Sequence, residues 1–157
     1  MTTLNAGDKT FALERATAAD VADIVALLVD DPLGQTRETA PLEHYLAAFA
    51  DIDRDPNQTL LVLRDDTRAV AGTVQLTVIA CLARGGTKRL QVEAVRLASH
   101  VRGLGLGTAL FQWIDEFATD HGATMIQLTS DARRTDAQRF YERLGYAASH
   151  VGYKRFL

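Results

Sequence analysis

The sequence contains a single cysteine, Cys81, and only three prolines among its 157 residues. One cysteine cannot form an internal disulfide, so we expect a hydrophobic core to hold the fold and a reducing, cytoplasmic compartment to contain it. Residues 1–9 are polar and include no apolar leader, and the longest apolar-rich stretch, 70–83, is interrupted by polar residues. A signal peptide, a membrane-spanning segment and a membrane partner are therefore not expected.

An excess of basic residues is also missing. The chain has 17 lysines and arginines against 20 aspartates and glutamates, which gives a net charge of −3. A protein of this charge has no general means of neutralising phosphates, so we expect no nucleic acid as a partner. Hydrophobic residues make up 47% and charged residues 24%, values typical of a globular protein. The length suits one domain, which we expect to cover residues 1–157.

The spacing of apolar residues predicts a strand, two helices, three strands and then alternating helices and strands. Thr17 and Asp20 form a capping box at the start of the first helix, and 31–34 break the chain after it. Gly122 and Gly145 follow the last two helical stripes as left-handed caps. The elements are expected over residues 11–16, 17–29, 41–51, 59–64, 68–80, 90–98, 106–117, 125–129, 137–144 and 146–156.

Three strands in succession favour antiparallel pairing, whereas the strand–helix–strand unit over 90–129 favours a parallel pair. The predicted fold is therefore α/β (α+β), with a mixed, mostly antiparallel sheet and helices on both of its faces. An open sheet edge beside the last predicted strand would allow a homodimer.

The segment after the strand 90–98 carries glycines at 103, 105 and 107, at the start of a predicted helix. Small residues there allow backbone N–H groups to converge, and a helix N-terminus adds partial positive charge, which together suit a pyrophosphate. Arg102 can reach the same anion. A tight strand-to-helix turn without a ligand is the alternative. The dinucleotide fingerprint and the P-loop both fail here, which disfavours a nucleotide-dependent oxidoreductase.

Two other chemistries find little support. Ser99 and His100 suggest a hydrolase, but no GxSxG elbow surrounds the serine, and neighbouring residues on a strand point to opposite faces. The histidines lack the spacing of metal ligands, so no metal is expected. Cys81 has no histidine partner and fits a small apolar residue of the core.

Two sequence blocks resemble the GNAT superfamily of acyl-CoA-dependent N-acetyltransferases. The first is Arg102-Gly-Leu-Gly-Leu-Gly107 after its strand, and the second is Arg134-Thr-Asp-Ala-Gln-Arg-Phe-Tyr-Glu-Arg-Leu-Gly-Tyr146. The second is similar to the family helix that ends in Phe-Tyr-Glu-x-Leu-Gly-Phe. The blocks cover about the C-terminal 40% of the chain, in the family's order and separation, and the expected element order also matches the family fold.

The resemblance implies that the chain uses acetyl-CoA as its acyl donor. Backbone groups of the strand would pair with the pantetheine arm, and N–H groups of the loop would hold the pyrophosphate. At the position of Arg134 many relatives carry Asn. Arg134 could bind a CoA phosphate or lie in solvent. The implied donor-binding residues are Val95, Leu97, Arg102, Gly103, Leu104, Gly105, Leu106, Gly107, Thr108 and Arg134.

Two residues are candidates for acid–base catalysis. The resemblance implies that Tyr141 protonates the departing thiolate, whereas its place on an apolar stripe also fits a tyrosine of the core. Glu93 lies in an apolar strand, where partial burial would suit a general base, although an exposed strand residue is the alternative. Because Cys81 lies outside both blocks, we expect direct transfer in a ternary complex without a covalent enzyme intermediate.

The acceptor is expected to be a primary amine of a small molecule or peptide. Asp30 and its neighbour could attract a cationic amine, and the stretch 30–45 supplies further polar groups, unless it is simply a solvated loop. The candidate acceptor-binding residues are Asp31, Gln35, Arg37 and Tyr45. The sequence thus predicts an acetyl-CoA-dependent N-acetyltransferase. A non-catalytic acyl-CoA-binding regulatory domain of the same fold is the alternative.

Overall fold

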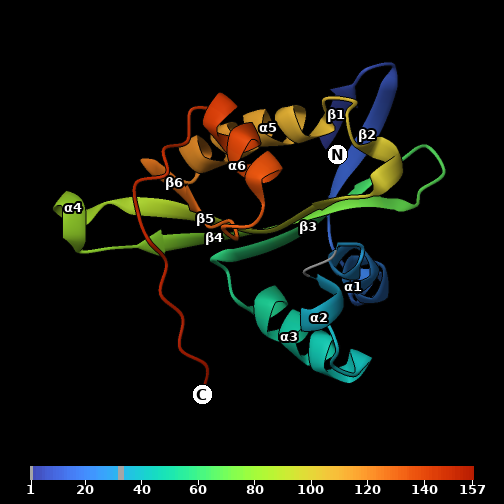
Figure 1. Ribbon diagram of the computed structural model, residues 1–157, viewed down its shortest axis with the longest axis horizontal. Coiled ribbons are helices and arrows are strands. Elements are labelled where there is room, and N and C mark those ends of the chain that lie inside the picture. Colours follow the sequence, from blue (N-terminus) through green and yellow to red (C-terminus); the bar gives the residue numbers. More distant parts are fainter. Residues whose placement is uncertain (1, 32–33) are drawn as a thin grey trace. The chain divides into compact units, whose positions relative to one another are not determined.

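In the computed structural model, which describes residues 2–31 and 34–157, the strands form a six-stranded sheet whose order follows the chain (Figure 1). The first five strands pair antiparallel, each with the next. The strands are β1 (Thr2–Ala6), β2 (Lys9–Arg15), β3 (Gln58–Arg64), β4 (Val70–Ala80), β5 (Lys88–Leu97) and β6 (Met125–Leu128).

The last strand, β6, lies beside β5 and runs in the same direction. The N–H of Thr124 donates to the carbonyl of Lys88 at 2.9 Å, so the two strands begin side by side. A helix connects them, which is the crossover that a parallel neighbour requires. The predicted mixed, mostly antiparallel sheet is therefore confirmed.

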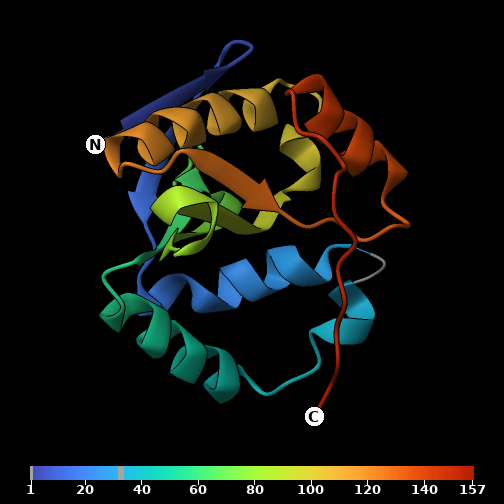
Figure 2. The same cartoon turned by 90° about the vertical axis from the view of Figure 1, so that its left-hand side faces the viewer.

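Helices cover both faces of this sheet, as predicted. In Figures 1 and 2, α1 and α3 lie on one face and α5 on the other. Two further helical elements are single short turns: α4 lies at the tip of the β4–β5 hairpin, and η2 lies before α5. The helices are η1 (Ala18–Asp20), α1 (Val21–Val29), α2 (Gly34–Arg37), α3 (Leu42–Arg54), α4 (Ala83–Gly86), η2 (Ser99–Val101), α5 (Leu106–Asp120) and α6 (Thr135–Arg143).

Alternating side chains of the central strands supply the core. Leu60 and Val62 of β3 pack against the buried faces of α1 and α3, together with Ile24 and Phe49. The intervening residues Leu61 and Leu63 are also buried, and alternation directs them to the other face. On α5, five buried residues follow helical spacing: Leu106, Leu110, Phe111, Ile114 and Ala118. Burial of each leucine, isoleucine or phenylalanine side chain among them contributes about 1.5–3 kcal/mol of transfer free energy.

The chain divides into two compact units, one that ends at Gln127 and one from Leu128 to Leu157. The first contains the helices up to α5 and nearly the whole sheet, and the second contains α6. The single domain expected over 1–157 and the cytoplasmic location stay predictions. In the described part of the chain, no helix is both long and apolar enough to cross a membrane.

The predicted capping box is confirmed, because the Asp20 carboxylate accepts from the Thr17 N–H at 2.8 Å and from its hydroxyl at 2.9 Å. Three expectations need correction. The strand β1 was not predicted, α3 extends to Arg54 instead of ending at 51, and the short helix α2 occupies part of the expected acceptor stretch. Pro32 and Leu33, which belong to that stretch and to the predicted break, lie outside the described residues.

The strand predicted over 146–156 is wrong, since the structure assigns no strand to those described residues. Val151, Tyr153 and Phe156 are all largely exposed. Their spacing of two and then three residues cannot direct all three side chains to one face of a strand, so no apolar face forms. The sheet edge that suggested a homodimer is therefore not built by this segment, and the homodimer stays a prediction.

Candidate functional site

The strand β5 contains a bulge in its second half. Thr73 and Gln75 of β4 pair with Arg96 and Glu93, so two steps along β4 correspond to three along β5. Within this interval Ala94 has φ of +52°, a left-handed conformation that costs a non-glycine residue about 1–2 kcal/mol. A bulge leaves its extra residue unpaired and redirects the backbone, and bulges are frequent beside active sites.

The same half of β5 also extends beyond its parallel neighbour. β6 is four residues long and begins beside the start of β5, whereas β5 is ten residues long. The strand β6 therefore accompanies only the first half of β5. Residues 94–97 offer their outer backbone edge to an extended ligand, as the predicted pairing of Val95 and Leu97 with a pantetheine arm requires.

The glycine-rich loop follows β5 and η2 and leads into α5. Gly103 and Gly105 have φ of +79° and +87°, and a Cβ added to either would meet no atom within 4 Å. Glycine is needed here for its backbone conformation, and the loop has open space above it. Gly105 is also the N-cap of α5, and the Ala109 N–H donates to its carbonyl at 3.1 Å.

The first turn of α5 therefore presents its N–H groups at the loop. Residues 106–108 precede Ala109, whose N–H makes the first bond of the helix ladder. The helix is fifteen residues long, and its dipole adds partial positive charge at this end. An open backbone cradle with converging donors suits a pyrophosphate, which is the chemistry that the glycine spacing predicts.

Arg102, at the start of this loop, is held from two sides. Its Nε donates to the Leu97 carbonyl at 3.0 Å, and its Nη2 lies 3.4 Å from both the carbonyl and the Oδ2 of Asp30. Asp30 is the C-cap of α1. Both side chains are about half exposed, so the guanidinium remains accessible to an anion from solvent.

Arg96 makes a second link between β5 and the end of α1. Its Nη1 donates to the carbonyl of Val95 at 2.7 Å, and its Nη2 lies 3.7 Å from the Oδ2 of Asp31. Asp31 Oδ2 also accepts from the Gly34 N–H at 3.2 Å. The carboxylate proposed to attract an amine thus already has a cationic neighbour. The pairing of Asp31 with Arg96 was not predicted. The only sign of it in the sequence is that Asp30 and Asp31 follow the first helix as two adjacent acids.

The other candidate acceptor residues come from α2 and α3. Gln35 and Arg37 are exposed on α2, and the Tyr45 hydroxyl donates to Glu38 at 3.1 Å. Partial burial raises the pKa of the Tyr45 hydroxyl, and the Glu38 carboxylate raises it further. α2 packs closely on α1, because a Cβ on Gly34 would lie 1.8 Å from the Leu28 carbonyl oxygen.

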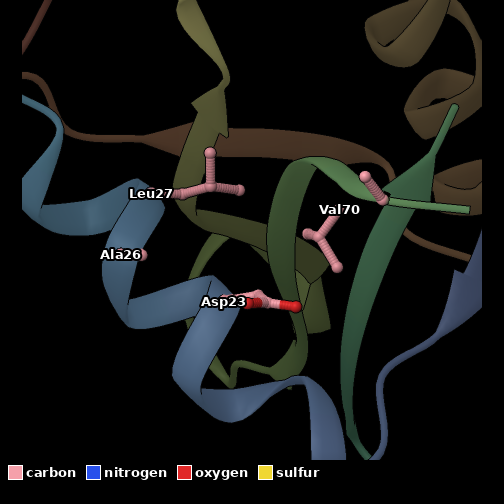
Figure 3. A pocket seen from close by; sticks show the side chains of 5 residues that line it. Asp23, Ala26, Leu27 and Val70 are labelled. Atoms are coloured by element: carbon pink, nitrogen blue, oxygen red, sulfur yellow. The ribbon is translucent and has the colours of Figure 1, made fainter. Parts of the chain in front are cut away.

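These candidates do not line the hollow of about 280 Å³ shown in Figure 3. That hollow lies between α1 and the start of β4, and a single carboxylate, Asp23, lies in its lining. Its remaining lining is apolar, from Ala26, Leu27, Ala69 and Val70. None of the predicted site residues belongs to it.

The candidate base Glu93 is exposed on β5, so the partial burial expected for its carboxylate is wrong. Its neighbour Val92 is buried, so the alternation of side chains along the strand already directs Glu93 to the opposite face. Glu93 lies beside the distorted backbone, and its role as a base stays a prediction.

The C-terminal unit contains the second sequence block on α6. Tyr141 is half-buried and makes edge-to-face contacts with Phe140 and Tyr146, with centroid distances of 5.4 and 6.1 Å. Arg134 is the N-cap of α6 and is also half-buried. The roles predicted for Tyr141 and Arg134 stay predictions.

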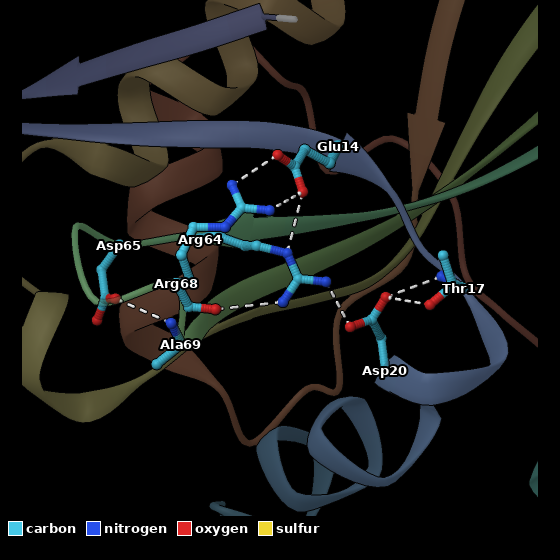
Figure 4. Close-up of polar contacts among 7 residues, drawn as sticks. All are labelled: Glu14, Thr17, Asp20, Arg64, Asp65, Arg68 and Ala69. Carbon is cyan, nitrogen blue, oxygen red and sulfur yellow. Dashed lines mark hydrogen bonds and ion pairs between the residues drawn. The ribbon is translucent and has the colours of Figure 1, made fainter.

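A polar network that was not predicted connects β2, η1 and the β3–β4 turn (Figure 4). Arg64 of β3 bonds Asp20 at 2.5 Å and Glu14 at 3.0 Å, and Arg68 bonds both oxygens of Glu14. These bonds hold the β3–β4 turn, whose Asp65 lies 3.8 Å from His100 in η2. The network therefore anchors the turn against which the segment before the glycine loop is placed.

The charges in this network are mutually stabilised. The hydrogen bond from Arg68 lowers the pKa of Glu14, and the Asp20 carboxylate raises the pKa of Arg64. The hydroxyl of Thr67 lowers the pKa of Asp65, and partial burial opposes this. Each of these groups is therefore held in its charged form.

Comparison with known proteins identifies relatives across most of the chain. The profile of the Acetyltransferase (GNAT) family matches residues 22–146. A transcriptional regulator from Bacillus halodurans has a similar crystal structure, with a TM-score of 0.87 and 38% identity over 94% of this chain and 99% of that one. A Trypanosoma brucei acetyltransferase has a TM-score of 0.75 and 27% identity over the same shares, 94% and 99%.

One curated relative is an aminoalkylphosphonate N-acetyltransferase from Salmonella typhimurium, 33% identical over 67 residues. The alignment covers 43% of this chain and 44% of that protein, so the chain spans less than half of its length. The match to the family profile, in contrast, includes both sequence blocks and every element from α1 to α6. The chain therefore belongs to the acetyltransferase (GNAT) family.

Proposed function

We propose that the protein transfers an acetyl group from acetyl-CoA to a primary amine by direct attack in a ternary complex. The observation that carries the proposal is the loop between β5 and α5. Its two left-handed glycines leave open space above a helix N-terminus, and the strand before it continues past its neighbour. An anionic, extended ligand such as CoA fits both features.

Different residues of this chain would bind different parts of the donor. N–H groups of residues 102–108 would hold the pyrophosphate, with Arg102 and Arg134 as candidate cations. The outer edge of Val95 and Leu97 would pair with the pantetheine arm. Their carbonyls already accept from Arg96 and Arg102, so the N–H groups on this edge are the more available partners.

When bound, acetyl-CoA supplies an activated thioester. The amine must first lose a proton, and Glu93, directly or through water, is the candidate base. The amine nitrogen then forms a bond to the carbonyl carbon while the carbon–sulfur bond breaks. A backbone N–H of the β5 bulge would stabilise the negative charge that develops on the carbonyl oxygen.

The thiolate leaves with the electron pair of the broken bond and needs a proton. Tyr141 is the candidate donor, because a tyrosine has a reference pKa of about 10 and a thiol about 8.5. The tyrosine would regain its proton from solvent. Cys81 is half-buried just after β4, outside the loop, which supports transfer without a covalent enzyme intermediate.

A substitution in the loop tests this proposal. Gly105→Glu introduces a negative charge at the N-cap of α5 and forces a left-handed non-glycine residue, so CoA affinity should fall by at least tenfold. Calorimetry with CoA measures this, and Gly152→Glu in the exposed C-terminal segment is the matched control. An unchanged affinity in Gly105→Glu would show that the site is wrongly assigned.

A non-catalytic acyl-CoA-binding regulatory domain is the second candidate, because the similar Bacillus halodurans protein is described as a transcriptional regulator. Thiol release from acetyl-CoA distinguishes the two functions. The acceptor panel should contain polyamines, aminoglycosides, amino acids and peptide N-termini, together with an aminoalkylphosphonate because of the Salmonella relative. Tight CoA binding without thiol release for any amine would favour the regulatory domain.

A further inference from the structure

The end of α1 contacts the start of the glycine loop through one arginine. Asp30 offers Arg102 two acceptors, its main-chain carbonyl and its carboxylate, both 3.4 Å from Nη2. The carbonyl belongs to the last turn of α1, where a cation is electrostatically favourable. Arg102 therefore contacts the end of α1, although the resemblance of its sequence motif assigns it to the donor.

We propose that Asp30 and the donor's pyrophosphate compete for Arg102, so that donor binding releases the Asp30 carboxylate. This inference rests on the proposed function and specifies how the site is regulated. Asp30 offsets part of the charge that Arg102 could offer to an anion. A pyrophosphate carries more charge than one carboxylate, and Nε of Arg102 stays with the Leu97 carbonyl, so Nη2 is the group that changes partner.

The release has a consequence for the second substrate. Asp30 opens the stretch 30–45 in which we expect the acceptor to bind, and its neighbour Asp31 stays near Arg96. Without donor, Asp30 is paired and unattractive to a cationic amine. With donor bound, its carboxylate becomes available. Binding of the donor would therefore strengthen binding of the amine, and by linkage the amine would strengthen binding of the donor by the same factor.

The contact is weak enough to exchange. Both side chains are more than half exposed, and exposed ion pairs contribute about 0.2–1 kcal/mol, which corresponds to a factor of about 1.4–5 in affinity. Asp30→Asn should therefore tighten CoA binding by up to about fivefold at low ionic strength. In an Arg102→Gln background, the same substitution should leave CoA affinity unchanged.

Calorimetry with CoA on the wild type, the two single variants and the double variant measures this coupling. Asp23→Asn is the control, because Asp23 is an exposed carboxylate on the same helix and a general charge effect would act through it as well. Weaker or unchanged CoA binding in Asp30→Asn would overturn the inference. Equal tightening in the Arg102→Gln background or in Asp23→Asn would also overturn it.

Hydrogen exchange provides a second readout. The Asp30 N–H donates to the Ala26 carbonyl at 3.0 Å in the last turn of α1. When CoA binds Arg102 and Asp30 loses that contact, the Asp30 amide should exchange faster in the wild type. In Arg102→Gln, addition of CoA should leave its exchange rate unchanged. Slower exchange in the wild type would contradict the release. A wild type that binds no CoA would instead refute the proposed function itself, so the two failures are distinguishable.

Discussion

Replacing Asp20 by asparagine would test whether its buried ion pair with Arg64 stabilises the fold. The side chain of Asp20 is only 6% exposed, and its carboxylate accepts three hydrogen bonds, two from Thr17 and one from Arg64. Asparagine keeps the shape but has one acceptor oxygen. Its NH₂ group must therefore face either Thr17 or Arg64, and both are donors.

The expected loss is about 3 kcal/mol of unfolding free energy. Breaking one partner of a buried ion pair costs about 3–5 kcal/mol, because the remaining charge is left uncompensated. Arg64 keeps its bond to Glu14 at 3.0 Å, so the lower end of that range applies. Loss of the capping bonds from Thr17 alone would cost only about 1 kcal/mol, and the two effects are therefore separable by magnitude.

Urea denaturation followed by Trp113 fluorescence measures this loss, and its pH dependence checks the cause. Burial alone would raise the pKa of Asp20, but the hydrogen bonds from Thr17 and Arg64 lower it below its ordinary value overall. A lowered folded-state pKa gives stability that is present above the unfolded pKa of about 4 and is lost as the pH falls further. The difference between wild type and Asp20→Asn should therefore shrink at pH 3.

Asp23→Asn is the control for this measurement. That carboxylate is exposed on α1, so its replacement should change stability by no more than about 0.5 kcal/mol. A loss below 1 kcal/mol in Asp20→Asn, or a difference that stays constant between pH 7 and pH 3, would refute the reasoning.

Two further predictions concern catalysis. Tyr141→Phe removes only a hydroxyl, so kcat should fall by about 10²–10⁴-fold while CoA affinity is retained. If the variant kept the kcat of the wild type across pH 6–9, Tyr141 would be a core residue only. Asp31→Asn should raise the acceptor KM more than the acetyl-CoA KM, measured with an amine that the thiol-release screen identifies. Equal effects on both KM values would instead assign Asp31 to supporting Arg96.

The parts of the fold that depend on local chemistry could be predicted. The Thr17–Asp20 capping box, the hairpin between β3 and β4 and the left-handed cap at Gly122 each involve residues close in sequence. The glycine-rich loop between β5 and α5 belongs to the same class, because a strand, three glycines and a helix start follow one another closely in the sequence. Such features can be predicted because the residues that form them are neighbours in the sequence.

The strand β1 could have been predicted from its turn. Gly7 and Asp8 connect Ala6 to Lys9 as a two-residue hairpin loop, and Gly7 has φ of +61°. Leu4 and Ala6 alternate with polar residues and are buried. The polar character of the segment as a whole concealed this short alternation, although Gly-Asp is a recognised hairpin sequence.

Long-range features of the site could not be predicted. Nothing in the sequence around Ala94 indicates a left-handed residue, because the bulge results from pairing with a strand about twenty residues earlier. The contacts of Asp30 and Asp31 with Arg102 and Arg96 join segments more than sixty residues apart. The exposure of Glu93, in contrast, follows from local alternation with the buried Val92, a pattern that the prediction of its burial overlooked.

The electrostatics of the site differ from those of the whole chain. The protein has a net charge of −3, yet residues 96–105, between the end of β5 and the start of α5, combine Arg96 and Arg102 with a helix N-terminus. The two aspartates at the end of α1 offset these arginines while the donor is absent. If the donor replaces Asp30 at Arg102 as proposed, a dianionic pyrophosphate would displace the carboxylate more readily than a singly charged anion, because it carries more charge.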